Sequence, residues 1–141
     1  MTDLAERFAS NPLLTPSDVP ASRTDLRVIC VLNPGAFMYD GKTWLILRVA
    51  EGIPATESMA SAVILDPAST GGVRRLEVRT DDPALEFSDP RVFRYHGQGY
   101  LTTLSHLRLA SSSDGAHFEV QHSPRPVFTG ALAQYRDVGR S

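Results

Sequence analysis

Short apolar segments at close spacing limit most strongly what this chain can fold into. Stretches rich in β-branched and apolar residues are separated by turns containing Gly, Asp, Ser and Pro. These stretches are 25–33, 43–51, 61–66, 73–79, 91–96, 99–105, 107–113 and 117–120. No amphipathic helical pattern of 10–15 residues lies between them, which argues against a parallel α/β sheet. The spacing predicts an all-β sandwich, barrel or propeller.

Two turns in the sequence are similar. Tyr39-Asp40-Gly41-Lys42 contains Asp-Gly, a strong signal for a tight hairpin, before the apolar strand 43–51. The segment YHGQGYLTTLS repeats the scheme from Tyr95, with a tyrosine before a glycine turn and a mainly apolar strand after it. The repetition fits small antiparallel sheets arranged radially, as in propeller blades, and fits two unrelated hairpins of a sandwich equally well.

Composition narrows the class of protein. With 141 residues, 42% of them hydrophobic and 21% charged, the chain suits one globular domain with a sizeable core. Its net charge of -2 provides no excess of basic residues for binding nucleic acid. Apolar runs such as 28–32 are too short to span a membrane, and the polar, charged N-terminus is not a secretory signal, so a cytoplasmic location is the default. The single cysteine, Cys30, cannot form an internal disulfide and is expected in a buried strand.

The N-terminal segment differs from the rest. Residues 2–9 could form a short helix with Thr2 as its N-cap. Three prolines between positions 11 and 20 then favour an extended conformation. We therefore divide the chain into a lead-in segment, 1–24, and a β-structured part, 25–141.

Two polar residues stand out beside apolar strand segments. Asn33 ends one such segment, and Asn33-Pro34-Gly35 would readily make a turn, but its amide could also bind a ligand hydroxyl. Arg48 lies inside the apolar run WLILRVAE. Because buried arginine is rare unless paired, we expect it either to pair with a carboxylate such as Glu51 or to project into a polar cavity.

Further polar groups recur around 88–91 and 105–108. Asp89, before Pro90 and Arg91, could be a turn residue or a catalytic carboxylate, and His106 and Arg108 begin another strand. The four histidines have no metal-ligand spacing, so no metal site is expected. They are His96, His106, His117 and His122.

The order of four motifs is more specific than any one of them. They are Asn11-Pro12-Leu13-Leu14-Thr15-Pro16, Asn33-Pro34-Gly35-Ala36, Leu47-Arg48-Val49-Ala50-Glu51 and Ser113-Asp114-Gly115-Ala116-His117-Phe118. With them the chain, from about Asn11 to its end, resembles glycoside hydrolase family 130, whose members are phosphorylases and hydrolases of β-mannosides on a five-bladed β-propeller. At roughly 40–60 residues per blade, the resemblance implies an incomplete propeller of about two to three N-terminal blades.

The resemblance also implies roles for individual residues. Asn33 and Arg48 would contact the sugar next to the scissile bond, and His106 and Arg108 are further candidates for substrate binding. The proton donor of the family is an aspartate in a Glu- or Tyr-Asp-Pro-Arg motif, and Asp89 begins the one Asp-Pro-Arg sequence here.

The order of motifs argues against Asp89 as the donor. In the family the serine-aspartate-glycine turn precedes the catalytic motif, whereas here 113–118 follows Asp89. We therefore prefer a structural Asp89 in an extra hairpin. On this alignment the tail that ends at Ser141 leads directly into the true motif, and the donor is the residue that would follow Ser141. The alternative, that Asp89 is the donor, stays open.

These observations predict a fragment of a carbohydrate-active enzyme that resembles inverting β-mannoside phosphorylases and glycosidases. Its partner would be an oligosaccharide, with inorganic phosphate as co-substrate if it is a phosphorylase, and with no other cofactor, nucleic acid or membrane. Whether the fragment is itself an enzyme, and whether it forms a homo-oligomer, stay open. The competing hypothesis is a non-catalytic carbohydrate-binding or structural β-module.

Overall fold

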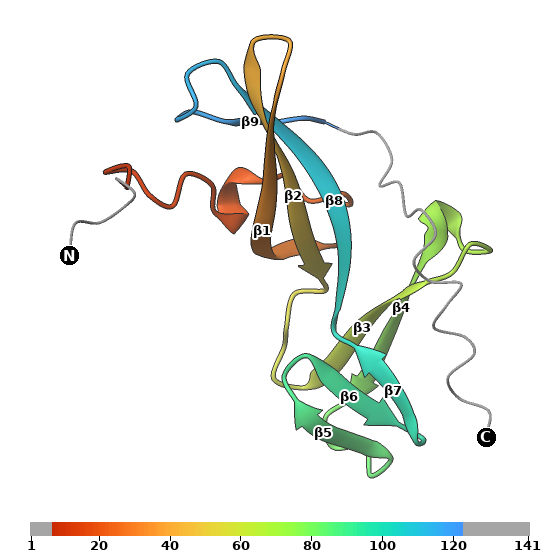
Figure 1. The fold of residues 1–141 in the computed structure, drawn as a ribbon. Coiled ribbons are helices and arrows are strands. Elements are labelled where there is room, and N and C mark those ends of the chain that lie inside the picture. Colours follow the sequence, from red (N-terminus) through yellow and green to blue (C-terminus); the bar gives the residue numbers. More distant parts are fainter. Residues whose placement is uncertain (1–6, 123–141) are drawn as a thin grey trace, which may run out of the picture.

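The structure, a computed structural model, describes residues 7–122 and contains three antiparallel sheets (Figure 1). Sheet A has the order β1-β2-β8-β9, sheet B is β3-β4, and sheet C is β5-β6-β7. The strands are β1 (Arg27–Tyr39), β2 (Lys42–Gly52), β3 (Met59–Leu65), β4 (Val73–Arg79), β5 (Leu85–Asp89), β6 (Val92–Tyr95), β7 (Gln98–Leu101), β8 (Thr103–Ser112) and β9 (Glu119–Val120), with 3₁₀ turns η1 (Pro16–Asp18) and η2 (Thr70–Gly72). The predicted all-β class is confirmed, and the three sheets do not close into a ring within the described residues.

Sheet A is built around the pairing of β2 with β8. The ladder runs without interruption from Thr43↔Ser112 to Gly52↔Thr103. Because Gly52 and Thr103 are direct partners, residues 53–102 interrupt what would otherwise be a simple hairpin. We call residues 53–102 the inserted unit; it forms sheets B and C in the lower half of Figure 1. The β6–β7 hairpin, which follows Asp89, is part of this inserted unit.

Both hairpins foreseen in the sequence are present. Asp40 and Gly41, at φ 49° and 68°, join β1 to β2. His96 and Gly97, at φ 49° and 77°, join β6 to β7. Two successive residues with positive φ are the requirement of a type I′ turn, whose twist matches that of the paired strands. The two similar turns thus lie in different sheets.

Asn33 lies within β1 rather than in a turn between strands. Leu32 pairs with Arg48 and Gly35 pairs with Ile46, so two residues of β1 stand opposite one residue of β2. This is a β-bulge, in which an unpaired residue bends the strand. Pro34 has no N–H to donate and asparagine tolerates the positive φ of 36°, so the bulge suits both residues.

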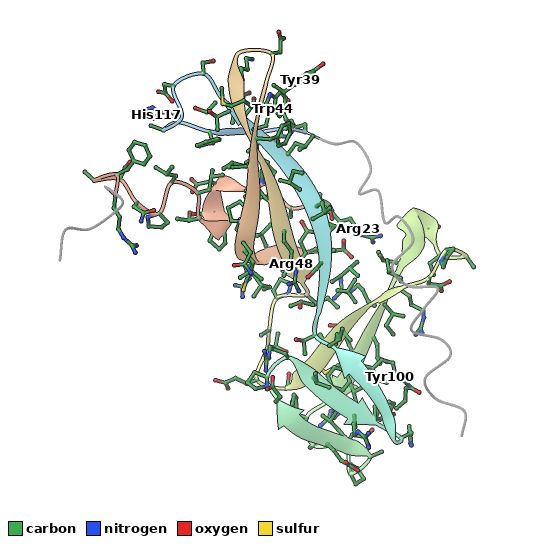
Figure 2. All side chains as sticks on the ribbon, in the orientation of Figure 1. Arg23, Tyr39, Trp44, Arg48, Tyr100 and His117 are labelled. Atoms are coloured by element: carbon green, nitrogen blue, oxygen red, sulfur yellow. The ribbon has the colours of Figure 1, made fainter. Side chains whose placement is uncertain are left out.

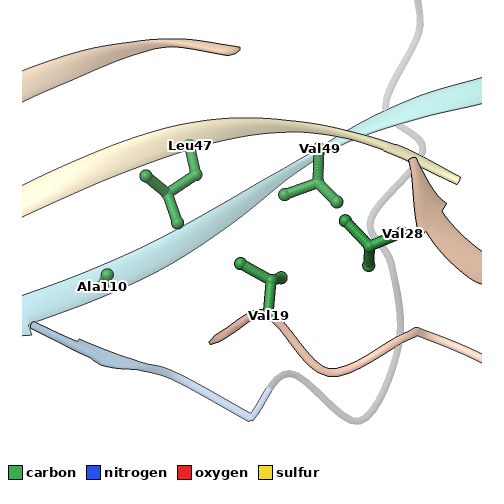
Figure 3. Close-up of a cluster of buried hydrophobic side chains, with 5 residues drawn as sticks. All are labelled: Val19, Val28, Leu47, Val49 and Ala110. Carbon is green, nitrogen blue, oxygen red and sulfur yellow. The ribbon is translucent and has the colours of Figure 1, made fainter. Parts of the chain in front are cut away.

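The lead-in segment covers one face of sheet A, which we call the inner face. Val19 packs there with apolar side chains from three strands (Figure 3). These side chains are Val28, Leu47, Val49 and Ala110. The alternation of buried and exposed residues along β2 and β8 reflects the two faces of the sheet.

Two apolar clusters organise the inserted unit. One joins it to sheet A, because Ile53, Val63 and Val73 pack with Leu26, before β1, and with Leu104 of β8. The other lies between sheets B and C around Phe93, which is fully buried among Ala60, Ala62 and Val78. The inserted unit therefore has a core of its own and is also anchored on sheet A.

Several details of the sequence-based prediction need comment. Strand β5 was not predicted, and the two predicted strands at 99–105 and 107–113 are instead β7 and the continuous β8. Cys30 is half-buried rather than buried. Most of the helix predicted at 2–9 lies outside the described residues, and so does the end of the predicted β-structured part, from 123 to Ser141.

Replacing Phe93 by alanine should lower the free energy of unfolding by about 3–5 kcal/mol, because the change leaves a cavity among packed side chains. Phe87→Ala is the matched control, since Phe87 pairs with Phe93 on the neighbouring strand but is 57% exposed. Its cost should stay below about 1.5 kcal/mol, the worth of one aromatic pair. Urea unfolding of both variants measures the difference, and equal losses would contradict a core centred on Phe93.

Candidate functional site

Arg48 lies on the outer face of sheet A, opposite the face covered by the lead-in segment. It is exposed, and its direct partners in the ladders are Leu32 on β1 and Leu107 on β8. Figure 2 shows Arg48 near the end of β2 that lies toward the inserted unit, while Trp44 and Tyr39 lie at the hairpin end. The arginine therefore lies between two leucines on this face.

The outer face carries exposed apolar side chains on all three long strands. Directly paired residues share a face, so the ladders place them side by side. They are Leu32 and Phe37 on β1, Ile46 on β2, and Leu107 and Leu109 on β8, with exposed fractions from 37% to 65%. Phe37 and Trp44 are stacked with ring centroids 6.4 Å apart. An apolar surface of this extent is typical of an interaction site.

Asn33 is the neighbour of Leu32, the residue that pairs with Arg48. It is exposed and has a positive φ of 36°, which is uncommon for a residue other than glycine. Asn33 therefore lies in the unpaired part of β1, next to the Leu32–Arg48 pair and opposite Leu47.

A buried polar cluster lies on the inner face at the same end of β2. The Glu51 side chain is 2% exposed and that of His106 is 1% exposed, and Glu51 Oε2 lies 3.3 Å from His106 Nε2. The backbone N–H of Ser22 donates to Glu51 Oε1 at 2.6 Å, and the Ser22 hydroxyl donates to Oε2. Burial raises the pKa of Glu51, but the contacts with His106 and Ser22 outweigh it and hold the pKa below its ordinary value.

Arg108 joins this inner face to two peripheral segments. Its Nη1 donates to the carbonyl of Pro20 at 3.2 Å, and its Nη2 donates to the carbonyl of Gln121 at 3.1 Å. Arg108 is buried and lies directly opposite Leu47 in the ladder. Both guanidinium contacts are with backbone of the chain itself.

The sequence-predicted candidates thus divide into exposed and buried residues of sheet A. Asn33 and Arg48 are exposed at neighbouring positions of β1 and β2, whereas His106 and Arg108 are buried on the inner face with partners inside the protein. The pairing of Arg48 with Glu51 that we considered does not form, because residues three apart on a strand point to opposite faces. Sequence reasoning named Glu51 only as that partner and missed its bonds to Ser22, since nothing local in the sequence links residues 29 positions apart.

Asp89 lies in sheet C, at the turn between β5 and β6, and its carboxylate is occupied by Arg91. The Arg91 backbone N–H donates to Oδ1 at 2.8 Å, and Nε and Nη2 donate to the two carboxylate oxygens at 2.9 Å. These hydrogen bonds lower the pKa of Asp89 to about 2. A carboxyl with that pKa is ionised at neutral pH, and these are the contacts expected of a structural turn residue.

The other predicted position of the proton donor is directly after Ser141. The tail from 123 to Ser141 lies outside the described residues, so its path relative to Asn33 and Arg48 is not part of the structure. A donor beyond Ser141 therefore stays a prediction from the order of the motifs. The contacts of Asp89 test only the alternative in which Asp89 is the proton donor, and they do not test a donor after Ser141.

The turn at 113–118 is held together by Asp114 in the way that Asp89 holds its own turn. Its carboxylate accepts the backbone N–H groups of Ala116 and His117, the hydroxyl of Ser112 and a contact from His117 Nδ1 at 2.7 Å. Those hydrogen bonds hold the pKa of Asp114 far below its usual range. Aspartate at this position of the motif therefore shapes the turn that leads into β9.

Residues 7–122 contain neither a metal centre nor a membrane-spanning helix. No group of three His, Cys, Asp or Glu residues in that range is arranged to hold a metal ion. No helix in the same range has the length and hydropathy needed to cross a bilayer.

Comparison with known proteins found a sequence relative and a solved structure. The chain is 38% identical over 140 residues to a β-1,2-mannobiose phosphorylase of Listeria innocua, an alignment that covers 94% of this chain and 38% of the relative. The solved complex of the β-1,2-mannobiose phosphorylase from Listeria innocua with β-1,2-mannobiose has a TM-score of 0.70 and 35% identity, covering 84% of this chain and 35% of that one. No protein-family model matches the chain. The chain thus spans well under half the length of these phosphorylases, and the similarity agrees with the resemblance noted in its motifs.

The protonation of Asp89 can be measured directly. Because its pKa is lowered in the folded chain, ionised Asp89 stabilises the fold above its ordinary pKa of 3.8, and this contribution is lost as the pH falls toward 2. Carboxyl-carbon NMR should give a midpoint near 2, and Arg91→Ala should raise it toward about 3.9. A midpoint near neutral pH would instead make Asp89 a candidate proton donor.

Proposed function

We propose that this chain is the N-terminal part of a manno-oligosaccharide phosphorylase of glycoside hydrolase family 130. The observation that carries the proposal is the similarity to β-1,2-mannobiose phosphorylase over 94% of the chain. The mannoside would bind on the outer face of sheet A at Asn33 and Arg48. His106 and Arg108, whose partners are inside the protein, would support the sheet instead of touching the sugar.

The chemistry of the outer face suits a sugar. A guanidinium has five N–H donors in a fixed plane and an amide has both donors and an acceptor, so together they match neighbouring hydroxyl groups. Leu32 and Leu107 flank Arg48 and offer an apolar surface to the C–H face of a pyranose ring. Such a combination of apolar lining and few polar groups is usual in small-molecule sites.

The reaction proposed for the whole enzyme is phosphorolysis with inversion. Phosphate oxygen attacks the anomeric carbon while the bond to the glycosidic oxygen breaks, and a carboxylic acid gives its proton to the departing oxygen. Attack from the face opposite the leaving group converts a β-mannoside into an α-linked sugar phosphate. The acid must stay protonated near neutral pH, which requires burial or a nearby negative charge.

Asp89 does not meet that requirement. It is bonded to Arg91 and has a pKa of about 2, so it has no proton to give at neutral pH. We therefore infer that the proton donor belongs to a part of the enzyme outside residues 7–122. A donor directly after Ser141, as the order of the motifs predicts, is consistent with this inference.

The exposed apolar surface supports the view that this chain is one part of a longer protein. Leu107 and Leu109 are 65% and 42% exposed on the outer face, beside Ile46. The alignment covers 38% of the Listeria innocua relative, so more than half of that protein remains to cover such a face. We infer that further β-structure packs over the hairpin end of the face and leaves Arg48 accessible.

Removing the Arg48 guanidinium should weaken binding of β-1,2-mannobiose about ten- to hundredfold, because a hydrogen bond to a charged group contributes about 1.5–3 kcal/mol. Titration of the chain with the disaccharide, followed by NMR, measures the change for Arg48→Ala. Arg94→Ala, an exposed arginine on sheet C, is the control and should bind like wild type.

Equal affinities of wild type and Arg48→Ala would remove Arg48 from the site. Binding of the disaccharide without phosphorolysis, even in a chain extended to the length of the relative, would favour the non-catalytic binding module.

Leu109→Lys, next to Ile46 and nearer the hairpin end than Arg48, tests the coverage of the outer face. In the 141-residue chain it should change the free energy of unfolding by no more than about 0.5 kcal/mol, as for other surface substitutions. In the longer protein it should cost several times more, because a charge would be buried. Leu101→Lys, at a position 62% exposed on sheet C, is the matched control. No difference between the short and long chains, measured by urea unfolding, would show that the face stays open.

A further inference from the structure

The buried Glu51 carboxylate makes more contacts than the end of strand β2 needs for its own backbone. A carboxylate taken out of water costs several kcal/mol unless its oxygens are bonded. Both oxygens of Glu51 are used, since Oε1 accepts the Ser22 backbone N–H and Oε2 accepts the Ser22 hydroxyl beside His106. One side chain thus connects the lead-in segment, β2 and β8 at a single point.

This point lies where the pairing of β1 with β2 is least regular. The register shifts between Val28 and Cys30 and again between Leu32 and Gly35. Only three consecutive pairs stand between these shifts, and the last of them is Leu32↔Arg48. Regular strand pairing therefore gives this segment of β2 little support from the β1 side. The bonds to Ser22 supply an anchor that does not depend on the register.

Glu51 and Arg48 are three residues apart on β2. Their side chains point to opposite faces of sheet A, so the same short stretch of backbone carries the buried carboxylate inward and the exposed guanidinium outward. Displacing one end of this stretch would displace the other.

We propose that Glu51 is a positioning residue for sugar binding: by holding Ser22 and His106 on the inner face, its carboxylate fixes the segment of β2 that presents Arg48 on the outer face. This inference rests on the proposed role of Arg48. Glu51 itself does not touch the sugar. Misplacing a binding group by about 1 Å can cost orders of magnitude in rate, so the effect on function can exceed the effect on stability.

The test compares Glu51→Gln and Ser22→Ala with the control Glu86→Gln, which changes an exposed glutamate on β5. Ser22→Ala removes one hydroxyl bond and keeps the backbone bond, so it decides the question if Glu51→Gln does not fold. Two readouts are taken on the 141-residue chain at a temperature well below unfolding. The first is the Arg48 Nε resonance and amide hydrogen exchange of residues 48–50 without ligand, and the second is the affinity for β-1,2-mannobiose.

We expect folded variants in which the Arg48 Nε resonance moves, exchange at 48–50 quickens, and affinity falls about tenfold or more for Glu51→Gln and less for Ser22→Ala. The control should match wild type in both readouts. Variants that lose only thermal stability, with an unchanged Arg48 resonance and affinity, would reduce Glu51 to a structural role and overturn the inference.

If the proposed function is wrong, the two readouts give a different result. If wild type does not bind the disaccharide, the sugar site is wrong, whereas the ligand-free Arg48 resonance still reports whether Glu51 controls the position of the guanidinium. An unchanged resonance in both folded variants overturns the positioning role whatever the affinity.

Discussion

The pairing of β2 with β8 is the interaction on which the rest of this structure depends. It joins residues separated by the 50 positions 53–102, and closing a loop of that length costs conformational entropy. The inserted unit offsets this cost because it folds around Phe93 and packs on Leu26, before β1, and on Leu104 of β8. Once the ladder is formed, sheet A has two long central strands whose faces differ in character.

The two faces of sheet A have different roles. The inner face buries Leu47 and Val49 beneath the lead-in segment and places Glu51 where the apolar packing ends. The outer face leaves Arg48 exposed between leucines. The side chains of successive strand residues point to opposite faces of the sheet. Packing that fixes a residue on the inner face therefore also fixes its neighbour on the outer face. A change in register by one residue would bury Arg48 and expose the core.

Local signals in the sequence predicted the strands and tight turns well, because a type I′ turn needs residues such as Asp40-Gly41 that tolerate positive φ. Arg48 was chosen as a candidate because a charge in an apolar strand is conspicuous, and the structure leaves its side chain exposed. The inserted unit was only partly predicted, since which strands pair is decided by packing between distant residues. The burial of His106 and Arg108 was missed for the same reason: their partners, Glu51 and backbone carbonyls, are far away in the sequence.

Asp89 shows why a motif has to be judged with its surroundings. The sequence Asp-Pro-Arg could present a proton donor, but here the arginine folds back and donates to both oxygens of the carboxylate. The ion pair favours the charged form, whereas general-acid catalysis needs the neutral one. The same three residues become a donor site only if the arginine is directed elsewhere and the carboxyl is buried. Sheet C offers neither condition to Asp89, so the motif by itself does not supply acid chemistry in residues 7–122. Under the proposed function, the carboxylic acid would have to come from another part of the enzyme.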